Sequence, residues 1–279
     1  MIYFSDIYPM ELDSISQIDE PLRQLIRRTG QFAREEFHRF SFSDVRFKRE
    51  RDPVSYVDIN AEKMLKEGCL RLIPGSGFVN EESDNTPSEN GWTWIIDPID
   101  GTTNYTHGIA NFCISLALQF QGETQLAYIY APILEEMFTA QKGKGAFLND
   151  QSIAISERPK LAESLLSTGF PYANFPWRDQ YLALVIALMD KAHGLRRMGS
   201  AALDMAYVAV GRFEGYFEFG LNPWDVAAGA LIVKEAGGKV SDFNGEDDYL
   251  YGSEIVVSNG NIHQDLLQEI RKHIPQEKN

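Results

Sequence analysis

The stretch that decides the fold runs from Trp92 to Asn104 and reads W-T-W-I-I-D-P-I-D-G-T-T-N. Its apolar beginning, Trp92 to Ile96, predicts a buried strand that delivers the carboxyl group of Asp97 at its end. Pro98 fixes the direction of the backbone at that point. Asp100 follows three residues after Asp97, so a turn of the chain brings both carboxylates to one place.

The residues around Asp100 predict a site for a metal ion and a phosphate group. Gly101 permits a ligand to approach the backbone closely, and the amides of Gly101, Thr102 and Thr103 can open a helix whose positive end accepts phosphate oxygens. Mg²⁺ takes hard oxygen ligands, which Asp97 and Asp100 supply. A bare D-x-x-D is more often an acidic turn that caps a helix. The preceding strand and the following Gly-Thr-Thr favour the metal site here.

The charge of the chain restricts its partners. Its 279 residues include 26 basic and 40 acidic ones, which gives a net charge of −14. This surface opposes binding to nucleic acid and to anionic membranes, because phosphate binding there depends on Lys and Arg. The same charge repels a phosphorylated metabolite, so a phosphatase of this composition needs bound cations. An apolar content of 44% allows one large core or two closely associated cores.

Composition also predicts a globular protein of the cytoplasm. Cys69 and Cys113 are the only cysteines, too few for a disulfide framework or a four-cysteine zinc site, which indicates reduced thiols. The N-terminus has no basic region followed by an apolar stretch, so no signal peptide is expected. The apolar run from Leu182 to Met189 is far shorter than the ~20 residues that span a bilayer.

The order of the predicted elements divides the chain near residue 155. A helix is expected from Asp19, then a basic hairpin or arm over Arg46–Arg51, then a short strand over Val54–Val57 that ends at Asp58 as a helix N-cap. Closely spaced strands then predict an antiparallel sheet: Trp92–Ile96, Phe112–Phe120, Gln125–Ile133 and Met137–Ala140.

In the second half of the chain, predicted helices alternate with short predicted strands. Helices are expected over Tyr181–Lys191, Ser200–Val210 and Asp225–Ala236, with short strands near Leu165, Tyr216 and Ile255. This alternation is typical of an α/β arrangement. Residues 1–155 therefore form an N-terminal α+β half that carries most of the acidic site, and residues 156–279 form an α/β half that completes it.

Three further acidic positions are weak signals when each is taken alone. Glu81-Glu82 is a pair that usually lies on a solvated surface, and Asp225 follows Trp224 where it can simply cap a helix. Asp58 has the same capping interpretation. They become candidate site residues because all of them fit one sequence pattern.

That pattern resembles the inositol monophosphatase family. The family signature of tryptophan and apolar residues followed by D-P-[IL]-D-G-T-x-N is matched by Trp94–Asn104, and its second signature, W-D-x-A-A-G, by Trp224–Gly229. Further matches are Lys48 with Asp58, Gly143–Asn149 and Gly199–Ala202. The family fold is a layered αβαβα sandwich, with an antiparallel sheet half and an α/β half around the site.

The resemblance implies two or three Mg²⁺ ions per site. Asp97 would bridge two of them, and Glu82 would stand with Glu81 near a third, looser ion. The implied ligands are the side chains of Glu81, Glu82, Asp97, Asp100 and Asp225, and the backbone carbonyl of Ile99.

The resemblance also implies the catalytic and substrate-binding residues. Thr102, hydrogen-bonded to Asp58, would position and activate the attacking water together with Glu81. The substrate would be bound by Asp100, Gly101, Thr102, Thr103, Gly199, Ser200, Ala201, Glu218 and Asp225.

By this resemblance the chain is expected to be a Mg²⁺-dependent, lithium-sensitive and homodimeric phosphomonoesterase. It would use a metal-activated water on a small polyol or sugar phosphate, with inositol monophosphate as the leading substrate. Fructose 1,6-bisphosphate, 3′-phosphoadenosine 5′-phosphate and NADP(H) remain alternatives within the same chemistry. Asn80 and Asn222 depart from the residues common in the family, and Asn222 leaves the substrate open.

A regulatory binding protein that kept the fold and lost the activity is the alternative from another class, since bacterial relatives associate with nucleic-acid machinery. The full set of expected carboxylates and the net charge oppose it. His107, the histidine nearest the site in the sequence, is expected on a helix surface.

Overall fold

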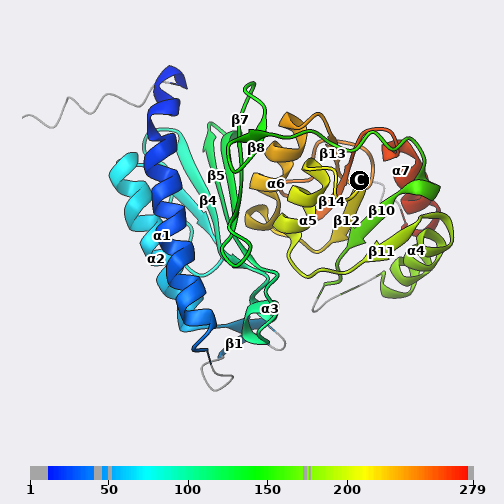
Figure 1. Cartoon of the computed structure of the whole chain (residues 1–279), viewed down its shortest axis with the longest axis horizontal. Coiled ribbons are helices and arrows are strands. Elements are labelled where there is room, and N and C mark those ends of the chain that lie inside the picture. Colours follow the sequence, from blue (N-terminus) through cyan, green and yellow to red (C-terminus); the bar gives the residue numbers. More distant parts are fainter. Residues whose placement is uncertain (1–11, 41–45, 50–51, 172–174, 176, 276–279) are drawn as a thin grey trace, which may run out of the picture.

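The computed structural model describes residues 12–40, 46–49, 52–171, 175 and 177–275. These residues form five layers in the order helices, sheet, helices, sheet, helices (Figure 1). The expected αβαβα sandwich is confirmed. No helix among the described residues has the length and apolar character to cross a membrane.

The N-terminal half is built on a seven-stranded sheet. Its strands, in spatial order, are β3 (Gly77–Asn80), β4 (Trp92–Asp100), β5 (Cys113–Phe120), β6 (Glu123–Ala131), β7 (Glu136–Gln141), β8 (Ala146–Leu148) and β9 (Gln151–Ser152).

The C-terminal half is built on a five-stranded sheet. Its strands, in spatial order, are β11 (Gly194–Arg196), β10 (Leu165–Thr168), β12 (Gly215–Phe219), β14 (Glu254–Ser258) and β13 (Lys239–Ser241). The β10 strand is parallel to both of its neighbours, and β14 is antiparallel to both of its own.

Helices cover both sheets and fill the space between them. The outer pair on the first sheet is α1 (Asp19–Phe37) and α2 (Tyr56–Leu72), and the outer pair on the second is α4 (Arg178–Lys191) and α7 (His263–His273) (Figure 1). The middle layer holds α5 (Ala201–Ala209) and α6 (Pro223–Glu235). The smaller elements are η1 (Leu12–Ile18), η3 (Leu161–Glu163), α3 (Thr102–Thr106) and the hairpin of β1 (Arg46–Arg49) and β2 (Asp52–Val54).

The β4 strand is buried on both faces, and its side chains alternate between two cores. Trp92, Trp94 and Ile96 pack in the core beneath α1 and α2. Ile95 points the opposite way, into the core with α5 and α6. This period of two places Asp97 on the α6 side of the sheet, because it follows Ile96.

The first sheet differs from the expected antiparallel sheet at one edge. The β3 strand pairs with β4 in parallel, whereas the remaining pairs of this sheet are antiparallel. The polar segment after β3 explains this, because it runs back along the strand and Thr86 forms an antiparallel bridge with Phe78. The chain therefore enters β4 from the same end at which it entered β3.

The expected strand over Val54–Val57 and the expected N-cap at Asp58 are both wrong. Val54 ends β2, whereas Tyr56 and Val57 already belong to α2. Ser55 is the N-cap, and Asp58 is the third helical residue of a capping box, in which its side chain accepts the Ser55 backbone N–H. The reciprocal box satisfies two free N–H groups of the helix end.

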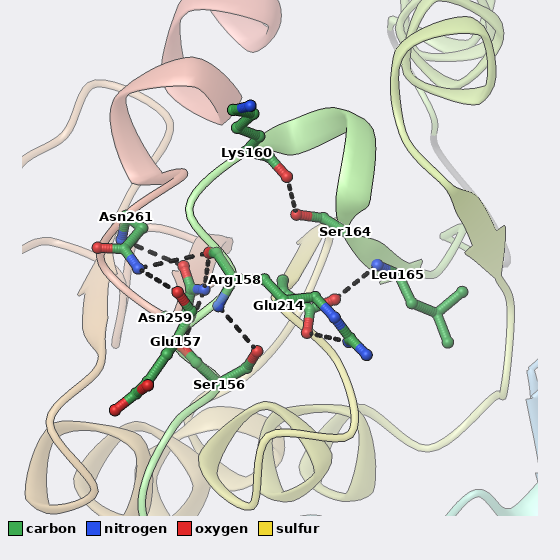
Figure 2. Close-up of polar contacts among 9 residues, drawn as sticks. All are labelled: Ser156, Glu157, Arg158, Lys160, Ser164, Leu165, Glu214, Asn259 and Asn261. Atoms are coloured by element: carbon green, nitrogen blue, oxygen red, sulfur yellow. Dashed lines mark hydrogen bonds and ion pairs between the residues drawn. The ribbon is translucent and has the colours of Figure 1, made fainter.

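The chain between the two sheets is tied to the C-terminal half, as Figure 2 shows. The Arg158 Nη1 atom lies 2.7 Å from Oε1 of Glu214, whose side chain is buried, and the Leu165 N–H donates to Oε2 at 2.6 Å. The Asn259 amide donates to the carbonyl groups of Ser156 and Arg158 at 3.1 and 2.8 Å. The core of the middle layer also takes side chains from both halves, so the halves pack as one unit.

Candidate active site

Three carboxylates meet between β4 and the start of α6. Asp97, Asp100 and Asp225 each place one oxygen within 4.8 Å of the other two. We call these three residues the acidic cluster. Asp97 and Asp100 are 2% and 7% exposed, whereas Asp225 is partly exposed. Asp225 is therefore the most accessible of the three carboxylates.

An irregularity in β4 aims Asp97 and Asp100 at the same place. The register of β4 against β5 shifts between Asp97, which pairs with Ser115, and Asp100, which pairs with Cys113. Pro98 lies at this break, where a residue without an N–H is tolerated. The Ile99 N–H donates to Oδ1 of Asp97 at 2.9 Å and fixes that carboxyl group. The D-P-I-D spacing therefore acts through a β-bulge.

The N-terminus of α5 holds the carboxyl group of Asp100. The Ser200 hydroxyl and the Ala202 N–H donate to its Oδ2 atom at 2.6 and 2.7 Å. The Cys113 thiol lies 3.7 Å from the same oxygen. Both cysteines of the chain are free, as expected, and both are buried. Ser200 is also the N-cap of α5, and it is 1% exposed. Its hydroxyl joins the start of α5 to Asp100.

Asp225 has a capping role as well as its place in the acidic cluster. Asn222 is the N-cap of α6, and its N–H donates to Oδ2 of Asp225 at 2.7 Å within a capping box. The carbonyl of Trp224 accepts a hydrogen bond from the Ser115 hydroxyl at 3.1 Å, which fixes the start of α6 against β5. Asn222, the variable family position, therefore orients Asp225.

Burial dominates the electrostatics of the cluster, and repulsion between the carboxylates adds to it. The pKa of Asp97 is raised well above its ordinary value by burial, then by the charges of Glu81, Asp100 and Asp225. The pKa of Asp225 is raised for the same reasons, with burial first and Asp100 next. Burial also raises the pKa of Asp100, which the hydrogen bonds from Ser200 and α5 oppose. Buried carboxylates in such proximity are favoured when a cation neutralises them, and hard oxygens suit Mg²⁺.

The paired glutamates follow β3 directly. The side chain of Glu81 hydrogen-bonds Asp97, so Glu81 lies at the edge of the acidic cluster. The N–H of Glu82 donates to Oε2 of Glu62 at 2.9 Å, and Glu62 is buried on α2. Glu62 was not expected at the site, and a glutamate on a helix gives no sequence signal for this contact. Asn80 ends β3, and its N–H donates to Oδ1 of Asn85 at 3.1 Å.

Thr102 begins α3 and contacts two of the predicted site residues. Its hydroxyl lies 3.0 Å from the Ile99 carbonyl and 3.2 Å from Oδ1 of Asp58. A hydroxyl has one proton to donate, so these two acceptors compete for it. Asp58 is fully buried, and the Ser55 N–H and hydroxyl donate to its other oxygen at 2.9 and 2.5 Å.

Two glycines let the loops of the two halves touch. Gly101 has a φ of +96°, and a Cβ there would lie 3.1 Å from the Gly199 carbonyl and 3.0 Å from that of Asn111. The Asn104 amide donates to the carbonyl groups of Asn111 and Met198 at 2.7 and 2.9 Å. The structure thus brings the segment around Gly199 beside the turn that begins at Gly101.

Glu218, in the C-terminal half, lies within electrostatic reach of Asp100 and Asp225. It lies on β12, and the Tyr216 hydroxyl donates to its Oε2 atom at 2.6 Å. Burial raises its pKa to about 7, and the charge of Asp100 adds to the shift, which places the two carboxyl groups in one electrostatic environment. His107 is the exposed C-cap of α3, on a helix surface as expected.

Comparison with known proteins agrees with this geometry. The sequence model of the inositol monophosphatase family matches residues 14–275. A putative Nus factor SuhB of Neisseria meningitidis serogroup B is 45% identical over 80% of this chain and 86% of its own length. An inositol-1-monophosphatase of Rhizobium meliloti is 39% identical over 90% of this chain and 95% of its own. The crystal structure of the suppressor protein suhB from Bartonella henselae superposes with a TM-score of 0.88 at 37% identity, over 92% and 100% of the two chains.

Proposed function

The chain belongs to the inositol monophosphatase family and is a phosphatase, and we propose that it hydrolyses inositol monophosphate with the help of Mg²⁺. The observation that carries the proposal is the acidic cluster, in which Asp97, Asp100 and Asp225 converge within 4.8 Å. The family is metal-dependent, and this cluster offers the hard oxygen ligands that Mg²⁺ prefers.

The family resemblance implies two or three ions at this site. Asp97 would be shared by two of them, because its side chain hydrogen-bonds Glu81 and one of its oxygens lies within 4.8 Å of an oxygen of Asp100 and of Asp225. Glu82 would hold a third, looser ion beside Glu81. The proposed ligands are Glu81, Glu82, Asp97, Asp100, Asp225 and the Ile99 carbonyl. When bound, Mg²⁺ would neutralise the carboxylates and the phosphate oxygens and lower the pKa of a water molecule. Lithium is expected to inhibit by replacing one ion.

Thr102, Asp58 and Glu81 are the proposed catalytic residues. The Asp58 carboxylate accepts from the Thr102 hydroxyl, which leaves the lone pairs of that oxygen to accept a hydrogen bond from the attacking water. Glu81, which hydrogen-bonds Asp97 at the edge of the cluster, is the proposed group that takes the proton of this water. Phosphoryl transfer asks the protein mainly for positioning and charge stabilisation.

The proposed substrate contacts divide between the two halves. The phosphate group would be bound by the turn at Gly101–Thr103, with Asp100 and Asp225 nearby. The hydroxyl groups of the ring would be bound by Glu218 and the segment Gly199–Ala201. The site would thus lie between residues 1–155 and residues 156–279, the two halves that we propose as structural units.

A panel of phosphate esters tests the substrate. Inositol monophosphate, fructose 1,6-bisphosphate, 3′-phosphoadenosine 5′-phosphate and NADP⁺ are compared by phosphate release at saturating Mg²⁺. We expect the highest kcat/KM for inositol monophosphate. A higher value for one of the others would assign that substrate instead, without changing the chemistry.

A regulatory binding role is the second candidate, favoured by the relatives named Nus factor SuhB. The net charge of −14 favours a protein partner over direct contact with RNA. Titration of the purified protein with an RNA and with a candidate protein partner, in low and in physiological salt, tests this. Tight RNA binding that survives physiological salt would contradict the charge argument.

The cytoplasm and a homodimer complete the proposal. The homodimer follows from the family resemblance and the cytoplasm from the composition, and the free, buried thiols of Cys69 and Cys113 suit a reducing compartment. Sedimentation of the purified protein tests the dimer, and a monomer at micromolar concentration would contradict it.

A further inference from the structure

Gly169 directly follows β10, and it lies beside Glu218 of the parallel strand β12. Thr168 is opposite Phe217 in the register of β10 and β12, so the next residues along the two chains, Gly169 and Glu218, lie side by side. A Cβ atom built on Gly169 would lie 2.0 Å from Oε2 and 2.1 Å from Oε1 of Glu218. The carboxyl group of Glu218 therefore fills the space that any side chain at position 169 would need.

Tyr216 holds the same carboxyl group from the other side. It precedes Glu218 by two residues on β12, so both side chains point to the same face of the sheet. Its ring is fully buried in the core between the two sheets, which fixes the hydroxyl that donates to Oε2 of Glu218 at 2.6 Å.

These two contacts matter because the surrounding charges act on the Glu218 carboxyl group in different directions. Arg197 attracts its carboxylate, whereas Asp100 repels it. Glu218 and the buried Asp204 of α5 also repel each other. A glutamate has three rotatable bonds, so without fixed neighbours its carboxyl group would shift toward the arginine.

We propose that Gly169 and Tyr216 are specificity-determining positioning residues, which fix where the Glu218 carboxyl group meets the hydroxyl groups of an uncharged polyol ring. The inference rests on the proposed function, in which Glu218 contacts that ring. A hydrogen bond to a substrate hydroxyl weakens steeply when its geometry changes, so displacing the carboxyl group by a methyl-sized step removes the contact. The phosphate side of the site does not depend on this step.

The test is Gly169→Ala, assayed on two substrates. The backbone at Gly169 lies outside the left-handed region, and the atoms that the new methyl meets are the end of a flexible side chain, so the fold should persist while Glu218 moves. For inositol monophosphate we expect kcat/KM to fall about 10- to 100-fold, mainly through KM. For p-nitrophenyl phosphate, which has no ring hydroxyls, we expect a change of about twofold or less.

Two control variants make the same chemical changes without altering a group that contacts the Glu218 carboxyl group. Gly194→Ala adds a methyl group to β11, where the nearest atom is Cδ1 of Leu165 at 3.3 Å. A second test variant, Tyr216→Phe, should also lower kcat/KM for inositol monophosphate, by a smaller factor than Gly169→Ala. Tyr181→Phe is its control, because that hydroxyl bonds Thr168 at 2.8 Å instead. Both controls should leave the preference between the two substrates unchanged.

A double variant shows whether Gly169 acts through Glu218. In a Glu218→Ala background, Gly169→Ala should have no further effect on inositol monophosphate, because the group it displaces is gone. Additive losses, an equal loss on both substrates, or an unchanged KM in Gly169→Ala would overturn the inference. If the wild type hydrolyses no inositol monophosphate, the proposed function fails first and the inference with it. If the wild type hydrolyses it and Gly169→Ala matches the wild type, only the inference fails.

Discussion

The hydroxyl oxygen of Ser200 lies 2.6 Å from Oδ2 of Asp100, which joins the N-terminus of α5 to the acidic cluster. Asp100 belongs to the first sheet and Ser200 to the second half of the chain. Because Oδ2 is held by this hydroxyl and by the N–H of Ala202, we expect Oδ1 to be the ligand oxygen. The hydrogen bond between Ser200 and Asp100 therefore belongs both to the acidic site and to the contact between the two halves of the chain.

Ser200→Ala should weaken both stability and Mg²⁺ binding. It removes a hydrogen bond to a buried carboxyl group and the N-cap of α5, so we expect a loss of about 1–3 kcal/mol in the free energy of unfolding. Chemical denaturation and calorimetric Mg²⁺ titration measure the two effects. Ser200→Thr, which keeps the hydroxyl, is the control and should resemble the wild type. Unchanged Mg²⁺ affinity in Ser200→Ala would show that Asp100 needs no such support.

Mg²⁺ should stabilise the protein more at pH 8 than at pH 5. The pKa values of Asp97 and Asp225 are raised by burial and by neighbouring carboxylates, so the metal-free fold binds more protons than the unfolded chain. Its stability therefore falls as the pH rises from about 4 through the raised values.

Bound Mg²⁺ replaces those protons, and at 100 times its Kd it adds about 2.7 kcal/mol to the free energy of unfolding. Melting curves at both pH values, with Mg²⁺ and with EDTA, give the difference. A larger effect at pH 5 would mean that the ion does not bind at the acidic cluster.

Thr102→Ala should slow catalysis without removing the metal. Its hydroxyl lies 3.2 Å from Asp58 and is not among the proposed principal ligands, so Mg²⁺ affinity should change little. We expect kcat to fall about 10²- to 10⁴-fold, the usual range for a positioned proton-transfer group, with KM nearly unchanged. Steady-state kinetics and a Mg²⁺ titration of the same variant measure both.

Asp58→Asn should lower kcat by a similar factor, and the double variant should be barely worse than either single one. Asp58 also accepts two hydrogen bonds from Ser55 at the start of α2, so the melting temperature of the Asp58→Asn variant should fall as well. Additive losses in kcat would show that Thr102 and Asp58 act separately.

His263 should make the protein sensitive to acid. It lies between Ser241 and Ser258, whose hydroxyl oxygens are 3.0 Å from Nε2 and 2.9 Å from Nδ1. Burial lowers its pKa to about 4, and Lys239 adds to the shift. The unfolded chain binds its proton near pH 6.5, so stability is complete above that pH and is lost as the pH falls toward 4.

Protonation of His263 should lower the free energy of unfolding by about 2 kcal/mol as the pH falls from 7.5 to 5. His263→Gln, whose side chain stays neutral, should remove that part of the pH dependence. The free energy of unfolding of the wild type and the variant, measured at both pH values, tests it. Equal slopes for the two proteins would contradict the assignment to His263.

The features that could be predicted from the sequence are those that depend on residues close together in the chain. The motif around Asp97 and Asp100 predicted a buried strand, a turn and convergent carboxylates, because those features depend on neighbouring residues. The layered fold followed from the resemblance. Asp58 was placed wrongly at the helix start, because Ser55 and Asp58 can both cap and only the backbone geometry decides between them.

Contacts between distant segments could not be predicted. Glu62 reaches Glu82 across 20 residues, and Ser200 reaches Asp100 across 100. Gly169 carries no signal of its own, since its importance depends on the strand register that places it beside Glu218. Such pairs depend on tertiary packing, which a single sequence does not reveal.

The central claim is that the acidic cluster holds the Mg²⁺ needed for phosphate release, and Asp97 is the residue that tests it. Phosphate release from inositol monophosphate is measured over a Mg²⁺ titration for the wild type and for Asp97→Asn, with melting curves to show that both are folded. We predict a saturable rise for the wild type, no turnover in EDTA, and at least a roughly 10²-fold lower rate for Asp97→Asn. Full turnover in EDTA, or a folded Asp97→Asn variant with the wild-type rate, would contradict it.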